Sequence, residues 1–523
     1  MLLLKFGEKE FMAEKPSTKK SEIQIVWFKR DLRITDHMPI YRASKNPIPT
    51  LMLYIVETDY WSKPFANRRH WCFIHDSLED LALDLATHKQ KLVIKIGSAI
   101  QVFKDLNLKY KIVHVFAHEE CGNRWTYDRD IEVRKWFLKS HIGFREFPSN
   151  GVVRGLKDRN EWSKIRNSRM QEQLIPTPNN ITAFKAEIGS PIPSKNDNIF
   201  FNNFTGNVQK GGRRQALKII NSFLKIRGKN YLYNISKPGK SEYTCSRISP
   251  HLTWGTISTK ELINMTKLKI KDLNENESKI WKKNISALNS RLTWRCHFIQ
   301  KLESQPSIEF QCMHSHFEKL RDKQLNSNFY SAWKNGLTGY PFVDACMRSL
   351  NYNGWITFRM RAMLVSFASY DLWLDWRKIG YHLAQMFTDY EPGIHYSQLQ
   401  MQSGVTGINT LRIYNPIKQS YDQDPKGEFI KKWVPELDNV PEAWIHEPWK
   451  MSNGTQKKSK CYIGIDYPFR IVDHSEAVKD AKSRFSKIIK KEGFNQKAKK
   501  IFSKLGSRSR KRDNLPNKQL SLF

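Results

Sequence analysis

The first third of the chain alternates between short apolar runs and amphipathic stretches. The apolar runs are Ile23–Phe28, Leu51–Val56, Leu92–Ile96 and Ile112–Phe116. Short runs of this kind, with no consistently polar face, are typical of strands buried in a parallel sheet. The stretches between them, for example Trp71–Ala86, place apolar residues at helical spacing. The alternation predicts an α/β domain over residues 22–150, built as a Rossmann-like, doubly wound parallel sheet.

The pattern changes twice after this domain. Residues 151–210 are rich in Pro and Asn and predict a linker between domains. Helical spacing then dominates and predicts an all-α domain over residues 211–470. The basic residues 471–523 are expected to form a helix and a frayed tail, and the polar residues 1–21 to be disordered. The predicted fold is therefore α/β plus all-α.

Composition adds a prediction about partners. The chain has 523 residues, enough for two domains with cores of their own. Its 87 Lys and Arg residues outnumber its 51 Asp and Glu residues, which gives a formal charge of +36. Such a charge favours a polyanionic partner, either a nucleic acid or an anionic lipid surface. No apolar run reaches the length of a transmembrane helix, so no membrane-spanning role is expected.

The cysteines point to a reducing compartment. There are 7 of them, scattered along the chain, and none forms a C-x-x-C pair. This pattern favours reduced thiols in the cytoplasm and predicts neither a metal site nor an iron–sulfur cluster. We expect the chain to act as a monomer.

The segment Trp333–Arg377 combines large apolar residues with several arginines. Arg359 and Arg361 lie two residues apart on a predicted helix, so they point to different faces. A buried guanidinium needs an anionic partner, so one arginine is suited to a cofactor phosphate and the other to a substrate phosphate. An aromatic core with arginines that reach to solvent is the alternative for such a helix.

The same segment resembles the flavin-binding domain of the photolyase/cryptochrome family. The family pattern W-x-x-G-x-T-G-Y-P-x-x-D-A-x-M-R is matched at residues 333–348, G-W-x-x-x-R-x-R at 354–361, and D-W-R at 375–377. Further similar stretches are residues 30–36, 245–258, 412–416 and 428–437. The resemblance spans roughly residues 23–470. The absence of cluster-ligand spacing among the cysteines separates the chain from the family branch that carries an iron–sulfur cluster.

The resemblance implies noncovalently bound FAD in the helical domain, and it leaves room for a second, antenna chromophore of unknown identity. The residues implied to bind FAD are Tyr233, Cys245, Ser246, Arg247, Ile248, Ser249, Arg295, Arg361, Asp389, Tyr390, Glu391 and His395. Cys245 stands where the family has Thr, and Tyr231 is a nearby alternative to Tyr233. Arg295 is implied to hold a flavin phosphate.

His395 stands where the family has an Asn that faces the flavin. The side chain of His titrates with an unperturbed pKa of about 6.5. The resemblance therefore implies a catalytic role, in which a cationic His395 stabilises the reduced flavin and passes it a proton. The alternative is a neutral His395 that is hydrogen-bonded to Glu391 or to a backbone carbonyl.

The resemblance also implies a set of substrate contacts. These residues are Arg291, Trp294, Trp355, Phe358, Arg359, Met401 and Arg412. Arg291 replaces a Glu that contacts the substrate in the family, and Phe358 replaces an Asn. The aromatic side chains Trp294 and Trp355 are suited to stacking on an extruded base.

An electron-transfer chain from solvent to the flavin is implied as well. The resemblance gives Trp376 the middle place and Trp333 the distal place in this chain. Leu399 occupies the place of the flavin-proximal Trp, which leaves a gap. Trp373, Tyr390 and Tyr396 are the candidates to fill it.

Three functions are consistent with the resemblance. The leading hypothesis is a light-driven lyase that splits cyclobutane pyrimidine dimers in DNA by electron transfer from photoexcited reduced FAD. The second is a lyase for (6-4) photoproducts, but Thr357 and Phe358 stand where that chemistry uses a His pair, which leaves His395 as a potential donor. The third is a cryptochrome-type blue-light sensor without repair. For the two lyases the implied partner is DNA with UV lesions.

Overall fold

The computed structural model describes residues 20–508 except 202, 274 and 322–324. It opens with a parallel sheet of strands β1 (Glu22–Phe28), β2 (Thr50–Val56), β3 (Leu92–Ile96), β4 (Lys111–His118) and β5 (Gly143–Phe147). The strand order is β3-β2-β1-β4-β5, so the winding direction reverses between β1 and β4. This is the predicted doubly wound sheet, and the prediction is confirmed.

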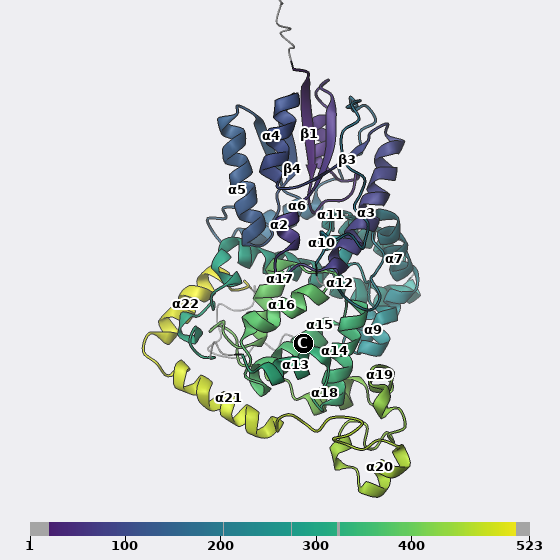
Figure 1. Ribbon diagram of the computed structural model, residues 1–523, viewed down its shortest axis with the longest axis vertical. Coiled ribbons are helices and arrows are strands. Elements are labelled where there is room, and N and C mark those ends of the chain that lie inside the picture. Colours follow the sequence, from purple (N-terminus) through teal and green to yellow (C-terminus); the bar gives the residue numbers. More distant parts are fainter. Residues whose placement is uncertain (1–19, 202, 274, 322–324, 509–523) are drawn as a thin grey trace, which may run out of the picture.

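Each face of the sheet is covered by helices, as Figure 1 shows. Helices α4 (Ala99–Lys109) and α5 (Arg124–Lys139) pack on one face, and α1 (Met38–Ala43) and α3 (Arg68–Thr87) on the other. The apolar pattern predicts β1 to β4 but misses β5. This strand lies at an edge of the sheet and is partly exposed, so Arg145 and Glu146 interrupt its apolar pattern.

A large helical region follows the sheet and completes the predicted α/β plus all-α fold (Figure 1). Its helices are α6 (Trp162–Gln171), α7 (Arg213–Lys225), α8 (Tyr231–Asn234), α9 (Pro238–Thr244), α10 (Ser249–Thr253), α11 (Thr259–Lys271), α12 (Glu275–Ser304), α13 (Ser327–Asn335), α14 (Pro341–Asn353), α15 (Phe358–Ser366), α16 (Trp376–Met386), α17 (Pro392–Gln402), α18 (Pro416–Gln423), α19 (Glu428–Trp433), α20 (Asn453–Ser459), α21 (His474–Ile489) and α22 (Phe494–Leu505). None of the helices in the described ranges is long and apolar enough to cross a membrane.

Two predictions about segments between and beyond the domains meet the structure only in part. The predicted linker, residues 151–210, contains helix α6. The predicted basic helix at the end of the chain is present as α21 and α22. Residues 1–19 and 509–523, on which the predictions of a disordered start and a frayed end fall, lie outside the described residues. The domain boundaries at 150, 210 and 470 stay predictions.

The loop after β1 joins the sheet domain to the helical region. Leu32 N–H donates to the carbonyl of Trp254 at 3.2 Å, and Arg33 Nη1 donates to the carbonyl of Gly255 at 2.9 Å. Gly255 has a positive φ of 71°, and a Cβ on it would lie 2.2 Å from the carbonyl oxygen of Arg30. Only glycine allows this approach of the two backbones. The charged loop is therefore a docking element, which fixes the sheet against one wall of the helical region.

A buried histidine, His382, lowers the stability of the fold because its ring nitrogens make no hydrogen bonds with described residues. His382 on α16 is 4% exposed, and neither ring nitrogen has a hydrogen-bond partner within the described residues. Its ring packs edge-on against Trp333 with the centroids 5.7 Å apart. Burial, with a smaller effect of Lys334, lowers the pKa of His382 to about 3. The folded protein therefore keeps His382 neutral at pH values where the unfolded chain binds a proton.

We predict that His382→Phe raises the free energy of unfolding by about 1–3 kcal/mol at pH 7, because an unsatisfied polar ring leaves the core. The variant should also lose less stability in acid. In the wild type the unfolded chain binds a proton at His382 below pH 6.5 that the folded protein does not bind, so the free energy of unfolding falls as the pH drops from 6.5 toward 3. Thermal melting between pH 7 and 4.5 measures both effects. A matched replacement of the exposed His141 by Asn should change neither, and a less stable His382→Phe at pH 7 would contradict the account.

Candidate cofactor and substrate cavity

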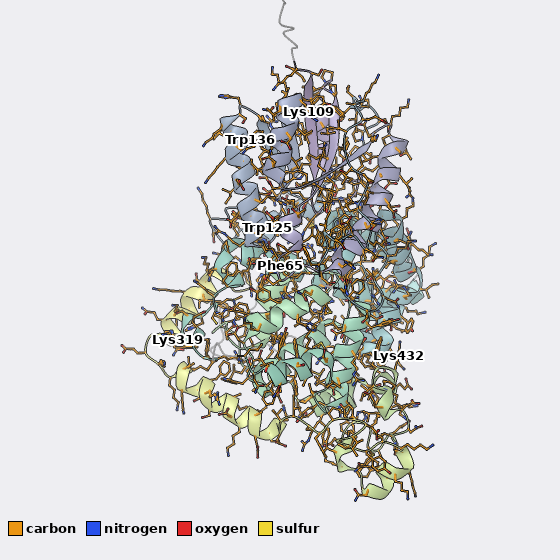
Figure 2. The ribbon with its side chains drawn as sticks, in the orientation of Figure 1. Phe65, Lys109, Trp125, Trp136, Lys319 and Lys432 are labelled. Carbon is orange, nitrogen blue, oxygen red and sulfur yellow. The ribbon has the colours of Figure 1, made fainter. Side chains whose placement is uncertain are left out.

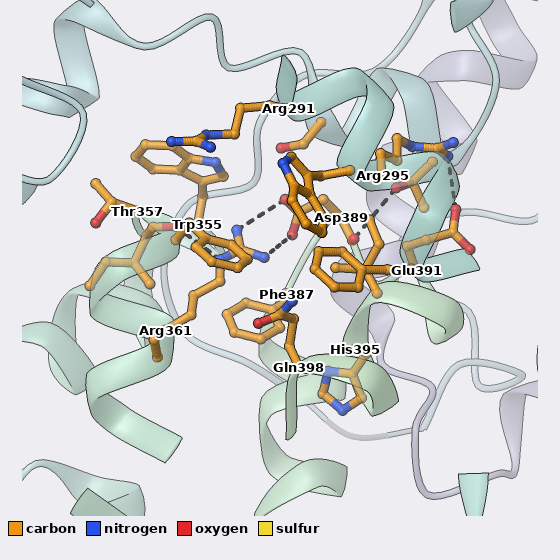
Figure 3. A pocket seen from close by; sticks show the side chains of 18 of the residues that line it. Arg291, Arg295, Trp355, Thr357, Arg361, Phe387, Asp389, Glu391, His395 and Gln398 are labelled. Carbon is orange, nitrogen blue, oxygen red and sulfur yellow. Dashed lines mark hydrogen bonds and ion pairs between the residues drawn. The ribbon is translucent and has the colours of Figure 1, made fainter. Parts of the chain in front are cut away.

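A cavity of about 530 Å³ opens in the helical region. Its walls come from the loop 245–249, from α12, from the segment 355–362 at the start of α15, and from residues 387–402 around the start of α17 (Figure 3). Ligand sites in proteins typically enclose about 300–1,000 Å³. The cavity therefore has the size of a site for a large organic cofactor.

The loop between α9 and α10 presents an arginine without a partner. Arg247 has a φ of 57°, an unusual left-handed conformation for a residue with a side chain. Its guanidinium lies over the indole of Trp355, 4.2 Å from the ring centroid. Its Nε is buried without a hydrogen bond, and its side chain forms no ion pair with any described residue. Burial lowers the pKa of Arg247, so an anion in the cavity would relieve a cost that the fold carries.

Two other arginines in the wall are neutralised by carboxylates. Arg361 Nη1 and Nη2 donate to the two oxygens of Asp389 at 2.9 and 3.0 Å, and Arg295 Nη2 donates to Glu391 at 2.9 Å (Figure 3). Burial alone would raise the pKa of Asp389, but Arg361 and the hydroxyl of Ser249 hold it below its usual value. Each of these two ion pairs has no net charge, so neither arginine is free to neutralise an anionic ligand. Arg247, rather than Arg295, is thus the arginine best suited to a phosphate.

The structure brings most of the predicted residues to this one cavity. Those that line it are Cys245, Ser246, Arg247, Ile248, Ser249, Arg291, Trp294, Arg295, Trp355, Phe358, Arg361, Asp389, Tyr390, Glu391, His395, Met401 and Arg412. Their individual roles stay predictions. What the structure adds is that side chains from five separate stretches of sequence share one space.

Tyr233 and Arg359 do not belong to this wall. Tyr233 is 76% exposed, so its predicted contact with FAD is wrong for this structure. Tyr231, two residues earlier on α8, is buried, lines the cavity and hydrogen-bonds Arg291. Arg359 points away from Arg361, as predicted, and its Nε donates to Ser236 Oγ at 2.9 Å.

His395 lines the cavity as a neutral side chain. Its Nε2 lies 2.9 Å from the carbonyl of Gly380, to which a neutral ring donates its proton. Burial lowers the pKa of His395 to about 3, although the hydrogen bond to Gly380 opposes the change. The predicted catalytic role of His395 as a cation beside the reduced flavin stays a prediction. The structure agrees with the alternative, a neutral histidine bonded to a backbone carbonyl.

The predicted electron route also needs correction. Trp333 is fully buried, and its Nε1 donates to the carbonyl of Leu364 at 3.1 Å, so it does not reach solvent as a distal donor must. Trp376 is 1% exposed, and Leu399 lines the cavity where the proximal aromatic was expected. Of the three candidates for the proximal place, Trp373, Tyr390 and Tyr396, Tyr390 is the one that lines the cavity.

An aromatic column starts at Tyr390 and enters the sheet domain. Its ring stacks on Phe65 at 5.9 Å, Phe65 contacts Tyr60 at 5.3 Å, and Tyr60 contacts Trp125 at 5.3 Å. Figure 2 shows Phe65 and Trp125 where the sheet domain meets the helical region. The phenol oxygens of Tyr390 and Tyr396 lie 3.2 Å apart. The gap beside Leu399 is therefore bordered by tyrosines that are already in contact with further aromatic rings.

Sequence reasoning missed several residues of the wall. Phe387 lies under the guanidinium of Arg361, with Arg361 Cζ 4.1 Å from its ring centroid. Gln398 and Gln402 line the cavity, and each has a buried amide atom without a partner, Nε2 in Gln398 and Oε1 in Gln402. The glutamines follow His395 at spacings of three and seven, which places them on one face of α17. That helical spacing is the signal from which both could have been found.

The crevice beyond the sheet offers little room for a second chromophore. Arg129 fills it, with hydrogen bonds of 2.5 Å to both Glu57 and Glu120 and a contact of 2.9 Å with Asp130. The two cavities that border it measure about 40 and 50 Å³, enough for a few water molecules. The residues present therefore do not fit a ring system here, and a second chromophore stays a prediction.

The geometry can be set beside known proteins. The family model described as DNA photolyase matches residues 24–157, and the model described as the FAD binding domain of DNA photolyase matches residues 287–487. The chain thus belongs to the DNA photolyase/cryptochrome family, and its helical region contains the family's FAD-binding domain. The predicted family and the predicted FAD cofactor are confirmed.

Relatives of two kinds are similar to the chain. A deoxyribodipyrimidine photo-lyase of Agrobacterium fabrum is 27% identical, with 89% of this chain and 98% of that protein covered. A cryptochrome DASH of Synechocystis is 26% identical, with 87% and 96% covered. A solved class III photolyase from Agrobacterium tumefaciens shares the fold, with a TM-score of 0.78 at 24% identity and coverage of 92% and 100%.

The residues of the cavity fit FAD. Arg247, which has no ion pair with a described residue, suits the pyrophosphate of FAD. Gln398 and Gln402 offer a donor and an acceptor that have no partner within the part of the chain that the structure describes. The two neutral Arg–carboxylate pairs add further hydrogen-bonding groups without adding net charge.

We predict that Arg247→Met weakens FAD binding by about 10- to 150-fold, the loss of one charge-assisted hydrogen bond of about 1.5–3 kcal/mol. The flavin-free variant should be at least as stable as the wild type, because it lacks a partly buried guanidinium that has no ion pair with a described residue. Flavin titration and thermal melting measure the two effects. Tyr233→Ala is the control and should bind FAD normally. Equal FAD affinity in Arg247→Met and the wild type would show that Arg247 does not hold the cofactor.

We predict that His395→Asn does not alter the pH dependence of flavin photoreduction between pH 5.5 and 8. With its pKa at about 3, His395 stays neutral over that whole range, and an Asn amide is neutral as well. Photoreduction rates of the two FAD-loaded proteins should give superimposable profiles. A sigmoidal step present in the wild type and absent in the variant would show that His395 does titrate.

Proposed function

We propose that the protein repairs pyrimidine dimers in DNA with light, and that cyclobutane dimers are its substrate. The observation that carries this proposal is a shared cavity. The Arg361–Asp389 pair, which fits a flavin, and the indoles Trp294 and Trp355, which fit an unstacked base, line the same space. When bound, FAD supplies light absorption and lends the electron that splits the dimer.

The aromatic side chains support an extruded substrate. Trp294 is partly exposed and stacks on Phe298 with the centroids 5.6 Å apart. The guanidinium of Arg247 packs on one face of the indole of Trp355. Stacking of a base on such a ring is worth about 1–3 kcal/mol. Extrusion costs a few kcal/mol, and less for a damaged pair, so two indoles are enough to favour a lesion.

Charge supports DNA as the partner. The excess of 36 cationic side chains favours a polyanion, and Arg291 and Arg412 bring positive charge to the cavity itself. Arg291 replaces a carboxylate of the family pattern, so the approach of a phosphate backbone meets less repulsion here. We propose that the chain acts as a monomer, and its 7 free thiols support a reducing compartment such as the cytoplasm.

The protonation chemistry of the site favours cyclobutane dimers over (6-4) photoproducts. The latter need a proton donor at the lesion. Thr357 uses its hydroxyl to accept from the backbone N–H of Met360, as the N-cap of α15, and Phe358 has no proton to give. His395 is neutral, and its donating nitrogen is engaged by Gly380. No proton donor of the required kind is therefore supplied by these three side chains.

A light sensor without repair is the second candidate. Leu399 in place of the expected proximal aromatic favours it, since a changed route of electrons to the flavin is compatible with a signalling role. The similarity to both photo-lyases and a cryptochrome also supports it. Repair activity on a defined lesion separates the two candidates.

We predict that the FAD-loaded, reduced protein removes a single cyclobutane dimer from an oligonucleotide under blue light and not in the dark. Trp294→Ala should lower the preference for damaged over intact DNA by about 5- to 150-fold, the loss of one stacking contact. Chromatography of the irradiated oligonucleotide and competition binding provide the readouts. Trp136→Ala, on α5 far from the cavity, is the control and should keep the preference (Figure 2). A tightly flavin-loaded protein with no light-dependent loss of dimer would favour the sensor.

A further inference from the structure

A second group of cations lies behind one wall of the cavity. Arg159 precedes α6, His297 and Lys301 lie on α12, and Arg508 follows α22, which packs on α12. His297 and Lys301 are four residues apart and so share one face of their helix. Arg159, His297 and Lys301 are 9%, 4% and 8% exposed. Three largely buried basic side chains therefore meet next to an exposed arginine, Arg508, from a distant part of the sequence.

None of these four basic side chains has a carboxylate partner among the described residues. The guanidinium of Arg159 donates through Nη2 to Nδ1 of His297 at 2.5 Å and lies 4.5 Å from the ring centroid of Trp162. The ammonium of Lys301 has no hydrogen bond or ion pair within the described ranges and lies 5.4 Å from the ring centroid of Phe298. Arg508 donates to Asn160 and to backbone carbonyls.

The electrostatics show that the cations repel one another. Burial, and then Arg159, lower the pKa of Lys301 to about 8. Burial and then Arg508 lower the pKa of Arg159 to about 10. Burial, with Lys301, Arg159 and Arg508, keeps His297 neutral with a pKa well below its usual value. A group of buried, mutually repelling cations is destabilising unless an anion joins it.

We propose that Arg159, His297 and Lys301, joined by Arg508, form a binding site for a phosphate group. A phosphate offers several acceptor oxygens and negative charge, and guanidinium and ammonium groups are its usual partners. Because His297 accepts from Arg159 through Nδ1, its proton lies on Nε2, which makes the neutral ring a donor as well. The site thus combines charge with directional donors.

The place of the site indicates the source of the phosphate. Trp294 contacts His297 edge-on with the centroids 5.2 Å apart, and Trp294 and Phe298 both line the large cavity. One layer of side chains therefore separates the cations from the proposed substrate space. The backbone of a strand whose base enters that space would carry a phosphate past this wall. The inference that the phosphate belongs to a DNA strand rests on the proposed function. A free phosphate ion would bind through the same chemistry.

The site should weaken as the pH rises. Lys301 faces Arg159 as a cation and His297 as a neutral ring, and with a pKa of about 8 it loses its charge above that pH. Phosphate binding would favour the charged amine and raise this pKa. Affinity should thus be full below about pH 7 and fall as the pH rises through 8. An arginine at position 301 would keep its charge and remove this loss.

The first experiment uses inorganic phosphate and the full, FAD-loaded chain. Thermal melting is compared for the wild type, Lys301→Met and Lys109→Met, the last of which removes an exposed charge from α4 (Figure 2). Phosphate should raise the Tm of the wild type and of Lys109→Met. Lys301→Met should have a higher Tm than the wild type without phosphate and show no shift with it. An equal phosphate shift in all three proteins would overturn the site.

The second experiment uses an undamaged single-stranded oligonucleotide in the dark, so its outcome does not depend on repair. In Lys301→Met the slope of log affinity against log salt should be smaller by about 0.7, the value for one lost phosphate contact. The wild type should bind more weakly at pH 9 than at pH 7, and Lys301→Arg should bind equally at both. A phosphate shift in Tm without any change in slope would support the site and overturn the strand as its source. No effect of Lys301→Met in either experiment would overturn the whole proposal.

Discussion

The need to balance buried positive charge governs this molecule. Its 87 basic residues exceed its 51 acidic ones, and some of the guanidinium and ammonium groups that folding buries have no carboxylate partner among the described residues. At the cavity two carboxylates neutralise arginines: Asp389 pairs with Arg361, and Glu391 pairs with Arg295 and, at 3.9 Å, with Arg30. In the crevice of the sheet domain, acidic side chains surround Arg129 in the same way. The pairs give these regions a fixed geometry, because a buried ion pair tolerates little displacement of either partner.

The cations that remain unpaired mark where ligands belong. Arg247 lines the cavity, and Lys301 lies behind the cavity wall. Neither side chain forms an ion pair with a described residue. Since an isolated buried charge costs several kcal/mol, such sites are more stable with a bound anion than without one. In a DNA photolyase/cryptochrome protein one anion at hand is the pyrophosphate of FAD, and the phosphates of the proposed DNA substrate would be others. The same imbalance that attracts a polyanion at long range can therefore position its groups at short range.

Much of the fold could be predicted from the sequence, because apolar periodicity reports burial directly. Apolar periodicity missed β5, an edge strand in which Arg145 is exposed and the side chain of Glu146, only 6% exposed, forms ion pairs with Lys29 and Arg154. Motif resemblance brought the right segments to the cavity but could not orient single side chains. Tyr231 and Tyr233 differ by about 200° around a helix axis, so an offset of two residues decides which of them is buried.

Contacts between distant segments explain the other failures. The neutrality of His395 depends on the carbonyl of Gly380, fifteen residues earlier, and the pairing of Arg295 depends on Glu391. The burial of Trp333 under α15 and α16 depends on helix packing that no local pattern contains. In each case the three-dimensional environment, rather than the residue type, decides the chemistry.

The central claim is that unpaired buried cations are completed by ligand phosphates. A crystal structure of the FAD-loaded protein bound to an oligonucleotide with one cyclobutane dimer tests it most directly. The account predicts the FAD pyrophosphate within hydrogen-bond distance of Arg247 and the dimer between the flavin and the indoles Trp294 and Trp355. A structure in which Arg247 has no phosphate neighbour, and the dimer lies outside the cavity, would contradict it.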